Sequence, residues 1–463
     1  MEINTAIVAG TGKSGISATK LLVNHGVKVY LFDENKDRDI EAIKEKTGDS
    51  ELVQIELGEL GEDALSSSQL MVISPGIPVD APFTDVVRNA GIPIWSEIEL
   101  AYHYGKGKIA AITGTNGKTT TTALVGEIVK AHNAKTIVVG NIGIPYTELC
   151  DTTDDDSDTV AEISSFQLET VIDFHPNVSA ILNLTPDHLN RHYTFENYGN
   201  VKFSITKNQT MDDVTVLNYD DEHTRAMGEK AKDHCHVVYF SRLEKPAGGV
   251  YVEDGDIILE DGDKKINVLA IKDLKLMGAH NVENVLAAVG ISYYMGVPVD
   301  VIRDVATSFK AVAHRIEYVD TVDGVAYYND SKGTNPDAAI QGIRAMTTAI
   351  KGIQAMVAPT FLIGGGYDKG SEYDEWIEAF DGKVKWLVLI GQTAQKIADC
   401  AKRHGFNSII FEENLQDAVA YCHENAVDGD AGLLSPACAS WGQFDNYEQR
   451  GDMFKEYVRS YKE

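Results

Sequence analysis

The sequence has few cysteines, and their spacing excludes the frameworks that cysteine usually builds. Five are scattered over 463 residues, with no C-x-x-C pair among them. An odd number of dispersed cysteines favours reduced thiols over a disulfide framework or a zinc site. We therefore expect a cytoplasmic protein.

Long hydrophobic runs are also missing. No stretch approaches the roughly 18 continuous apolar residues that a membrane helix needs. The N-terminal segment MEINTAIVAG lacks the basic region and long apolar run of a secretory signal. We expect no membrane insertion.

Positive charge is scarce. The chain has 41 Lys and Arg against 70 Asp and Glu, a formal net charge of −29. Nucleic-acid binding requires a basic surface, so we expect no nucleic-acid partner. The acidity itself is explained by solubility, and any anionic ligand must be held by helix N-termini, backbone N–H groups and individual lysines.

What the sequence does contain is a repeated order of strand, turn and helix. Three series of β-branched runs start near INTAIVAG, KIAAITG and GVAYYNDS, each followed by segments with helical spacing. This alternation predicts α/β domains with parallel sheets. We expect a Rossmann-like N-terminal domain (residues 1–105), a central P-loop ATPase-type mixed α/β domain (106–311) and a Rossmann-like C-terminal domain (312–463).

One segment breaks this order. GGVYVEDGDIILEDGDKKINVLAI alternates in polarity and carries acidic-glycine turns. It predicts a β-meander inside the central domain.

The first glycine loop, Gly10 to Gly15, matches G-x-G-x-x-G between a strand and a helix, and Asp33 ends the next strand. Glycines let the backbone approach a diphosphate, the helix N-terminus attracts negative charge, and a carboxylate accepts from a hydroxyl or ring N–H. A tight turn with close helix packing explains the same pattern. An NAD-dependent dehydrogenase is the first function that it suggests.

The second glycine loop, GTNGKT from Gly114 to Thr119, also lies between a strand and a helix. Backbone N–H groups can wrap phosphates, Lys118 can reach the terminal ones, and the Thr119 hydroxyl can bind Mg²⁺. The glycine spacing is shorter than in the common G-x-x-x-x-G-K-[ST] loop. The alternative is a glycine-rich helix start.

Two further residues suit a metal-nucleotide site. Glu162 ends the apolar strand TVAEISS, where an unpaired charge is costly to bury, and His188 follows the strand in NLTPDH. Each has a common structural alternative. We favour a functional role because both follow strands of the sheet that carries Lys118 and Thr119.

Together with these loops, the segments EISSFQLE, NLTPDHLNRH, GAHNVENVLAA, AHRIE and NDSKGTNPDA resemble the Mur ligases, ATP-dependent enzymes that build the peptide of the cell-wall precursor. The motifs occur in family order over nearly the whole chain. The tail LLSPACASWGQFDNYEQRGDMF resembles the D-glutamate-adding member, and the D-N-P-R motif of the diaminopimelate- or lysine-adding member is absent.

The resemblance implies a reaction in which UDP-N-acetylmuramoyl-L-alanine and D-glutamate are joined through an acyl phosphate made from ATP. No enzyme nucleophile is needed, so positioning and charge neutralisation supply the acceleration. The implied catalytic residues are Lys118, His188 and Lys202. Two Mg²⁺ ions are implied, with metal ligands Thr119, Glu162, His188 and Lys202, the last as a carbamylated lysine.

The resemblance also assigns binding residues. For ATP they are Gly114, Thr115, Asn116, Gly117, Lys118, Thr119, Thr120, Asn281, Asn284, Arg315, Asp330 and Lys332. For the UDP substrate they are Thr11, Gly12, Lys13, Ser14, Asp33, Glu34, Ser74, Pro75, Gly76 and Asn141. For D-glutamate they are Thr334, Lys369, Ser440 and Tyr447.

For single residues the resemblance leaves plainer explanations open: helix capping for the asparagines and a surface pair for Arg315 with Asp330. It implies a monomer whose C-terminal domain closes on ATP. Two other functions stay open from the sequence. One is another amide ligase of the superfamily, either another Mur ligase or folylpolyglutamate synthetase. The other is a dinucleotide oxidoreductase or a nucleotide-binding regulator.

Overall fold

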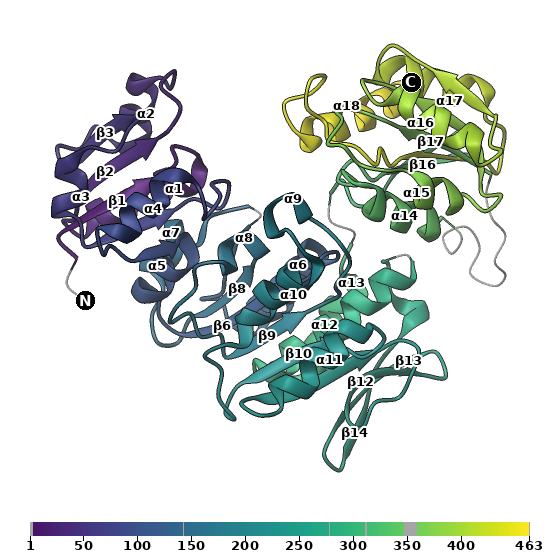
Figure 1. The fold of residues 1–463 in the computed structure, drawn as a ribbon. Helices are drawn as coiled ribbons and strands as arrows, with labels where there is room; N and C mark the ends of the chain where they lie inside the picture. The colour runs from purple at the N-terminus through teal and green to yellow at the C-terminus, as the bar shows by residue number, and fades with distance from the viewer. Residues whose placement is uncertain (1–2, 142, 277, 311–312, 347–358, 463) are drawn as a thin grey trace. The chain divides into compact units, whose positions relative to one another are not determined.

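The chain folds into two compact units, which are described separately below. The computed structural model describes residues 3–141, 143–276, 278–310, 313–346 and 359–462. The first unit comprises Met1–Ala270 and Glu283–Ala306, and the second comprises Ile271–Val282 and Thr307–Glu463. The first contains two sheets and the second contains one (Figure 1). The predicted boundary at residues 311 and 312 lies outside the described residues, and the three-domain boundaries stay a prediction.

The first sheet has five parallel strands in the order β3-β2-β1-β4-β5. This is the strand order of a Rossmann fold without its sixth strand. β1 and β4 are almost wholly buried apolar runs, as expected for parallel strands covered on both faces. The elements are β1 (Thr5–Ala9), α1 (Lys13–Asn24), β2 (Lys28–Asp33), α2 (Ile40–Thr47), β3 (Val53–Leu57), α3 (Glu62–Ser67), β4 (Leu70–Ile73), α4 (Pro82–Asn89), β5 (Ile94–Ser96) and α5 (Glu97–Tyr104).

The second sheet has nine strands in the order β14-β13-β12-β11-β10-β9-β6-β8-β7. Its parallel part places β6 between β8 and β9, so the segments that end these three strands share one edge. The elements are β6 (Lys108–Thr113), α6 (Lys118–His132), β7 (Ile137–Gly140), α7 (Tyr146–Leu149), β8 (Asp158–Glu162), α8 (Ser165–Leu168), β9 (Val178–Ile181), α9 (Leu189–His192), α10 (Phe195–Phe203), β10 (Val214–Asn218), α11 (Glu222–Ala231) and β11 (His236–Ser241).

The predicted β-meander is confirmed. β12 (Gly249–Glu253), β13 (Asp256–Asp261) and β14 (Lys264–Ala270) pair antiparallel, and in Figure 1 they form one end of this sheet. The β12–β13 turn is Asp254-Gly255, with φ of 52° and 86°. Two successive positive φ values define the hairpin turn that Asp-Gly favours. The chain continues into α12 (Ala279–Tyr294) and α13 (Val299–Ser308).

The second unit is built on a six-stranded sheet in the order β15-β16-β20-β17-β18-β19. Its strands are β15 (Glu317–Val322), β16 (Val325–Asn329), β17 (Thr360–Gly364), β18 (Val384–Leu389), β19 (Ile409–Phe411) and β20 (Ala431–Leu434). β15 pairs antiparallel with β16, and the other pairs are parallel. β15 was not predicted from the sequence.

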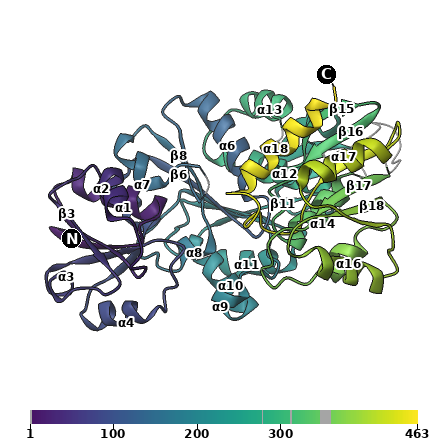
Figure 2. The same ribbon diagram turned by 90° about the horizontal axis from the view of Figure 1, so that it is seen from above.

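Helices cover both faces of this sheet (Figure 2). α14 (Pro336–Ala345), α15 (Asp374–Glu378) and α16 (Ala394–Arg403) contribute to one buried apolar cluster, which includes Trp376 and Ile397. α17 (Leu415–Asn425) and α18 (Tyr447–Ser460) contribute to another, which includes Val419 and Phe454. The predicted α/β fold class is confirmed. Among the helices in the described ranges, none combines the length and apolar character needed to cross a bilayer.

Candidate active site

The first glycine loop connects β1 to α1 through a very close backbone approach. Gly10 has a φ of 103°, and a Cβ added at Gly15 would lie 1.8 Å from the carbonyl oxygen of Gly10. Any side chain at position 15 would therefore force the helix away from the strand. Glycine at these two positions allows the N-terminus of α1 to lie close to the end of β1.

Asp33, at the end of β2, is bound to this loop. Asp33 Oδ2 accepts two hydrogen bonds from Thr11, one from the backbone N (3.1 Å) and one from Oγ1 (2.6 Å). Arg38 Nε lies 3.2 Å from the same Oδ2. Burial raises the pKa of Asp33, but the hydrogen bonds from Thr11 and Asn35 and the charge of Arg38 outweigh it, so the pKa is lowered overall. Asp33 is therefore an ionised carboxylate that orients the glycine loop.

All ten residues predicted to bind the UDP substrate line one cavity of about 460 Å³. The structure brings together the first glycine loop, the end of β2, the turn after β4 and Asn141. Arg38 and Gln167 also line the cavity, and the sequence analysis missed both. No spacing signal marks them, since each reaches the cavity from a different part of the chain.

The second glycine loop has the geometry of a phosphate loop. Gly117, with a φ of 83°, caps α6, and a Cβ there would lie 2.2 Å from Asn284 Oδ1. The loop is held on its other side by Asn183, whose Oδ1 accepts from the backbone N of Asn116 at 2.8 Å. Thr119 and Thr120 lie buried in the first turn of α6. The backbone N–H groups at a helix start are suited to bind an anion.

Two lysines meet at this loop. Lys118 Nζ donates hydrogen bonds to the carbonyl oxygens of Gly114 and Thr115, each at a distance of 2.8 Å. Lys202, on α10, is 1% exposed, and its Nζ donates a hydrogen bond to the same Gly114 oxygen at a distance of 2.9 Å. Burial, together with the charge of Lys118, lowers the pKa of Lys202 well below its ordinary value. A buried lysine with a lowered pKa is a reactive amine.

Glu162 ends β8 and is 1% exposed. Its Oε1 accepts from Asn141 Nδ2 over 2.9 Å, while its Oε2 is buried and has no hydrogen-bond partner among the described residues. An unsatisfied buried carboxylate oxygen is costly unless a cation or donor completes it. Because Asn141 also lines the cavity at the first glycine loop, this hydrogen bond joins that cavity to the phosphate-loop edge.

His188 lies just before α9, with a φ of 53°. Its side chain is half exposed, contacts the ring of Phe166 and lies 3.5 Å from Asp187. Arg191, on the helix that follows, donates to the carbonyl oxygens of Pro75 (2.7 Å) and Ile77 (2.9 Å). The His188 segment is thereby attached to the turn that lines the UDP cavity. The sequence analysis missed Arg191.

Asn281 and Asn284 lie in α12 and are buried. Asn284 Oδ1 accepts from Thr121 Oγ1 at 3.3 Å, which places it against the first turns of α6. Asn284 therefore contacts the phosphate-loop helix itself.

In the second unit, Asp330 follows β16 and is 4% exposed. It accepts from Ser435 Oγ over 2.7 Å. Burial raises the pKa of Asp330 to about 7, against the opposing effects of that hydrogen bond and of Arg315. Arg315 Nε is itself buried without a hydrogen-bond partner among the described residues.

The residues predicted for D-glutamate lie on neighbouring loops of the second unit. Lys332 Nζ lies 5.1 Å from the centre of the Tyr447 ring, and Lys369 Nζ lies 5.1 Å from that of Trp441, next to Ser440. A β-bridge between Tyr367 and Ala439 holds the Lys369 and Ser440 loops together. Thr334 belongs to the Lys332 loop, where its N donates to the Lys332 carbonyl.

Arg450 connects these loops from beneath and was not predicted. It is fully buried, and it donates to Ser331 Oγ (2.9 Å), to the Ser331 carbonyl (2.6 Å) and to the Cys438 carbonyl (3.2 Å). Its hydrogen bonds therefore set the spacing between the loop of Lys332 and that of Ser440. The residue lies in the tail segment that resembled the family, but only its burial shows what it does.

The sheets, the phosphate loop with its buried Glu162, and the cavity at the first glycine loop agree with an ATP-dependent ligase. Matches to family models in three parts of the chain agree with this class. Residues 4–96 match the Mur ligase MurD-like N-terminal domain, 112–292 the Mur ligase middle domain, and 314–438 the Mur ligase glutamate ligase domain. The chain belongs to the Mur ligase family, which removes the dinucleotide oxidoreductase alternative.

Curated relatives match over the full length. The UDP-N-acetylmuramoylalanine–D-glutamate ligase of Lachnospira eligens is 54% identical over 460 residues, 99% of each chain. That of Lachnoclostridium phytofermentans is 50% identical over 457 residues, 99% of this chain and 98% of the relative. That of Clostridioides difficile is 45% identical over 460 residues, 98% of each.

Solved structures share the fold. UDP-N-acetylmuramate-alanine ligase MurC from Thermotoga maritima has a TM-score of 0.61 at 18% identity and covers 99% of this chain and 100% of that one. The MurF ligase from Thermotoga maritima in complex with ADP has a TM-score of 0.59 at 16% identity and covers 98% and 95%. At these identities the likeness establishes the three-part fold alone.

Proposed function

We propose that this protein is an ATP-dependent ligase that adds D-glutamate to UDP-N-acetylmuramoyl-L-alanine during synthesis of the peptidoglycan precursor. The observation that carries the proposal is the 54% identity, over 99% of both chains, to a relative named for this activity. The structure supports it by joining the UDP cavity to the phosphate loop through Asn141 and Glu162.

The proposed chemistry has two steps. An oxygen of the L-alanyl carboxylate attacks the γ-phosphorus of ATP, the bond from that phosphorus to the β–γ bridging oxygen breaks, and ADP leaves. The amine of D-glutamate then attacks the acyl carbon, and phosphate leaves with the electrons of the broken C–O bond. The attacking amine loses a proton as it becomes an amide.

The first glycine loop binds the substrate's diphosphate. Thr11, Gly12, Lys13 and Ser14 present N–H groups and side chains at the N-terminus of α1, where negative charge is favoured. The other proposed contacts are Asp33, Glu34, Ser74, Pro75, Gly76 and Asn141. Asp33 acts mainly by holding the loop through Thr11.

ATP lies along the second glycine loop, with its phosphates on the backbone from Gly114 to Thr120. Lys118 starts from a position on the loop carbonyls, from which a short side-chain rotation carries its charge to the γ-phosphate. Neutralising that charge in the transition state is the largest contribution a residue of this kind makes. Asn281 and Asn284 are proposed contacts of the base.

The donors at this edge fit Mg²⁺, which prefers carboxylate and hydroxyl oxygens. The buried Oε2 of Glu162, which has no hydrogen-bond partner among the described residues, suits a cation, and Thr119 places a hydroxyl in the first turn of α6. We propose Thr119 and Glu162 for one ion and His188 with a carbamylated Lys202 for a second. A Mg²⁺ ion held by these residues would neutralise phosphate charge.

The carbamate on Lys202 would form when its amine adds to CO₂ and loses a proton, giving an anionic oxygen ligand. Only a neutral amine reacts this way. Burial of Lys202 and the nearby charge of Lys118 favour the neutral form.

The second unit supplies the amino-acid end. Arg315, Asp330 and Lys332 are proposed ATP contacts, and Thr334, Lys369, Ser440 and Tyr447 are proposed D-glutamate contacts. D-glutamate carries two carboxylates, which lysines and hydroxyls are suited to bind. We propose a monomeric cytoplasmic enzyme with domains at 1–105, 106–311 and 312–463, the last closing when ATP binds and excluding water from the acyl phosphate.

The test is ADP release from ATP with UDP-N-acetylmuramoyl-L-alanine, with and without D-glutamate. We expect turnover only with both substrates, and none when L-alanine or L-glutamate replaces D-glutamate. Lys118→Ala is the catalytic control, with an expected loss of roughly 10²–10³-fold.

Turnover with L-alanine on the UDP-N-acetylmuramate substrate, or with L-glutamate on a folate, would replace this proposal with the superfamily alternatives. Full activity of Lys118→Ala would remove the proposed phosphate site.

A further inference from the structure

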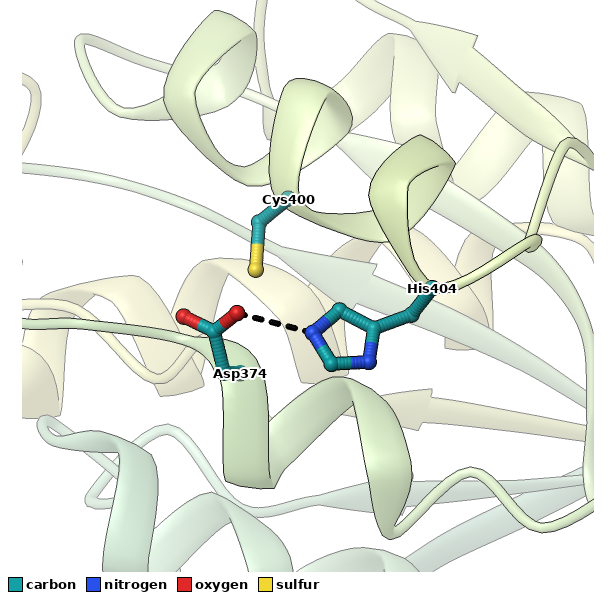
Figure 3. A group of neighbouring side chains, drawn as sticks. All are labelled: Asp374, Cys400 and His404. Atoms are coloured by element: carbon teal, nitrogen blue, oxygen red, sulfur yellow. Dashed lines mark hydrogen bonds and ion pairs between the residues drawn. The ribbon is translucent and has the colours of Figure 1, made fainter.

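Helices α15 and α16 bring a thiol, an imidazole and a carboxylate together on the second unit. Cys400 and His404 are four residues apart at the end of α16, so they share one face of it. Asp374 begins α15. Figure 3 shows the Cys400 sulfur and the His404 ring both directed at the Asp374 carboxylate. One ligand atom from each residue lies within 4.8 Å of the others.

The cluster differs from an ordinary surface ion pair in its buried thiol. His404 Nε2 lies 2.7 Å from Asp374 Oδ1, and both side chains are partly exposed, but Cys400 is 2% exposed. Two groups of this kind occur among the described residues, and the other contains no cysteine. A sulfur, a nitrogen and an oxygen ligand together suit zinc or another borderline-soft divalent cation.

A second carboxylate lies on the far side of the imidazole. Glu378, one turn after Asp374 on α15, places Oε1 3.7 Å from His404 Nδ1. Nε2 of His404 faces Asp374 and Cys400, so in a metal-binding tautomer the ring proton lies on Nδ1, which faces Glu378. Metal-binding histidines commonly hold their other nitrogen in this way, because the carboxylate sets the tautomer and the ring orientation.

We propose that Asp374, Cys400 and His404 form a binding site for Zn²⁺ or a similar cation, with Glu378 orienting the histidine. Zinc bonds of about 2.0–2.3 Å place tetrahedral ligand atoms roughly 3.3–3.7 Å apart. Asp374 Oδ1 and His404 Nε2, which are 2.7 Å apart, would therefore separate slightly on binding, and the Cys400 sulfur, which lies within 4.8 Å of the other two ligand atoms, would move closer to them; rotation of the partly exposed Asp374 side chain allows both changes.

One charge opposes the cation. Arg403 Nη2 lies 3.6 Å from Asp374 Oδ1, but its side chain is 60% exposed and can turn into solvent when a metal takes that oxygen. A nucleophilic role for Cys400 is a poorer explanation of the cluster, because substrate cannot reach a sulfur that is 2% exposed.

A cation bound here would link α15 and α16, the two helices that flank the Lys369 loop. α15 begins just after that loop, and Lys396 on α16 donates to the Ser371 carbonyl within it over 2.8 Å. Bound metal would therefore stabilise the second unit near this loop, without contacting the residues proposed for the reaction. The inference rests on the cluster and does not depend on the proposed function.

The test uses the full chain, stripped of metal with a chelator and titrated with Co²⁺ while the near-ultraviolet absorbance is followed. Bonding of Co²⁺ to a thiolate produces a charge-transfer band that oxygen and nitrogen ligands do not. We expect one equivalent to produce this band and Zn²⁺ to displace it. Binding to the other acidic or histidine groups of the chain would leave this region unchanged.

Variants locate the ligands. Cys400→Ser is expected to abolish the band, and Asp374→Asn or His404→Gln to weaken Co²⁺ binding about tenfold or more. Cys422→Ser and His423→Gln on α17 are matched controls that keep it. Asp374→Asn alters a partly exposed side chain, so it remains informative even if Cys400→Ser fails to fold.

A wild-type titration with no charge-transfer band would overturn the proposal. So would a band that persists in folded Cys400→Ser, or Co²⁺ affinity that Asp374→Asn and His404→Gln leave unchanged. Zn²⁺ that raises the melting temperature of wild type and controls, but not of the ligand variants, would support it.

Discussion

Asn141 donates a hydrogen bond from Nδ2 to Oε1 of Glu162 over 2.9 Å. Asn141 follows β7 and Glu162 is the last residue of the neighbouring strand β8. Gly140 makes their approach possible, because a Cβ there would lie 2.2 Å from the Glu162 carbonyl oxygen. One residue lines the cavity at the first glycine loop, and the other carries the unsatisfied carboxylate oxygen at the phosphate loop. In the proposed function, this hydrogen bond connects the site of the acceptor substrate to that of ATP.

Glu162→Gln should separate catalysis from stability. We expect ADP release to fall roughly 10²–10³-fold, because a charged metal ligand is lost. Without Mg²⁺ the melting temperature should stay the same or rise, because a neutral amide replaces an incompletely paired buried carboxylate. Parallel activity and melting measurements check this, with Glu169→Gln as a second carboxylate variant. Wild-type turnover at low Mg²⁺ in Glu162→Gln would exclude the metal role.

Lys202→Ala should lower turnover by a similar factor of about 10²–10³. A short-chain carboxylic acid should restore part of it, by placing an anionic oxygen where the carbamate would lie. Lys207→Ala is the matched control, since Lys207 lies five residues on and donates to the Val171 carbonyl. The assay is ADP release with both substrates. Wild-type activity of Lys202→Ala would end the carbamate proposal.

Glu97 should make stability depend on pH. It is fully buried, accepts from Gln167 Nε2 over 2.6 Å, and burial raises its pKa from 4.5 to about 7. The folded chain then binds the Glu97 proton more tightly than the unfolded chain between these values. The free energy of unfolding therefore falls as pH rises toward 7 and levels off above it.

Between pH 5.5 and 8, wild type should lose about 2 kcal/mol more stability than Glu97→Gln. Urea unfolding across this range measures the difference. The raised pKa of Asp330 produces a slope of the same sign but is common to both proteins, so it cancels. Parallel curves for the two proteins would show that Glu97 is ionised in the fold.

Arg450→Met should disturb the second unit at two levels. Three hydrogen bonds from a charged, fully buried donor are lost, which leaves carbonyls of Ser331 and Cys438 without this partner and costs about 2–4 kcal/mol. The KM for D-glutamate should rise several-fold, because the loops of Lys332 and Ser440 lose their common anchor. Melting curves and D-glutamate saturation curves measure both effects.

Arg459→Met, exposed on the same helix α18, is the control and should behave as wild type. Arg450→Lys should recover part of the stability, since it keeps the charge but not the three-way geometry. An unchanged KM in a folded Arg450→Met would confine Arg450 to stability.

Much of the fold could be predicted from the sequence because its signals are local. The βα order of the sheets follows from the spacing of apolar residues, and the Asp254-Gly255 turn follows from residues that accept positive φ. Both glycine loops and Glu162 at a strand end were also visible, because each depends on its immediate neighbours. β15 could not be predicted from the sequence, because its antiparallel pairing with β16, and not the pattern of its own residues, makes it a strand.

Only the tertiary structure decided which distant residues meet. Arg38, Gln167 and Arg191 reach the UDP cavity or its turn from separate segments, and Arg450 joins loops more than a hundred residues apart. The scattered cysteines argued against a metal site, yet Cys400 lies beside Asp374 and His404. The sequence determined the elements and the phosphate chemistry through short-range pattern. Packing alone selected the long-range contacts, because burial and hydrogen bonding between distant segments leave no periodic trace in the chain.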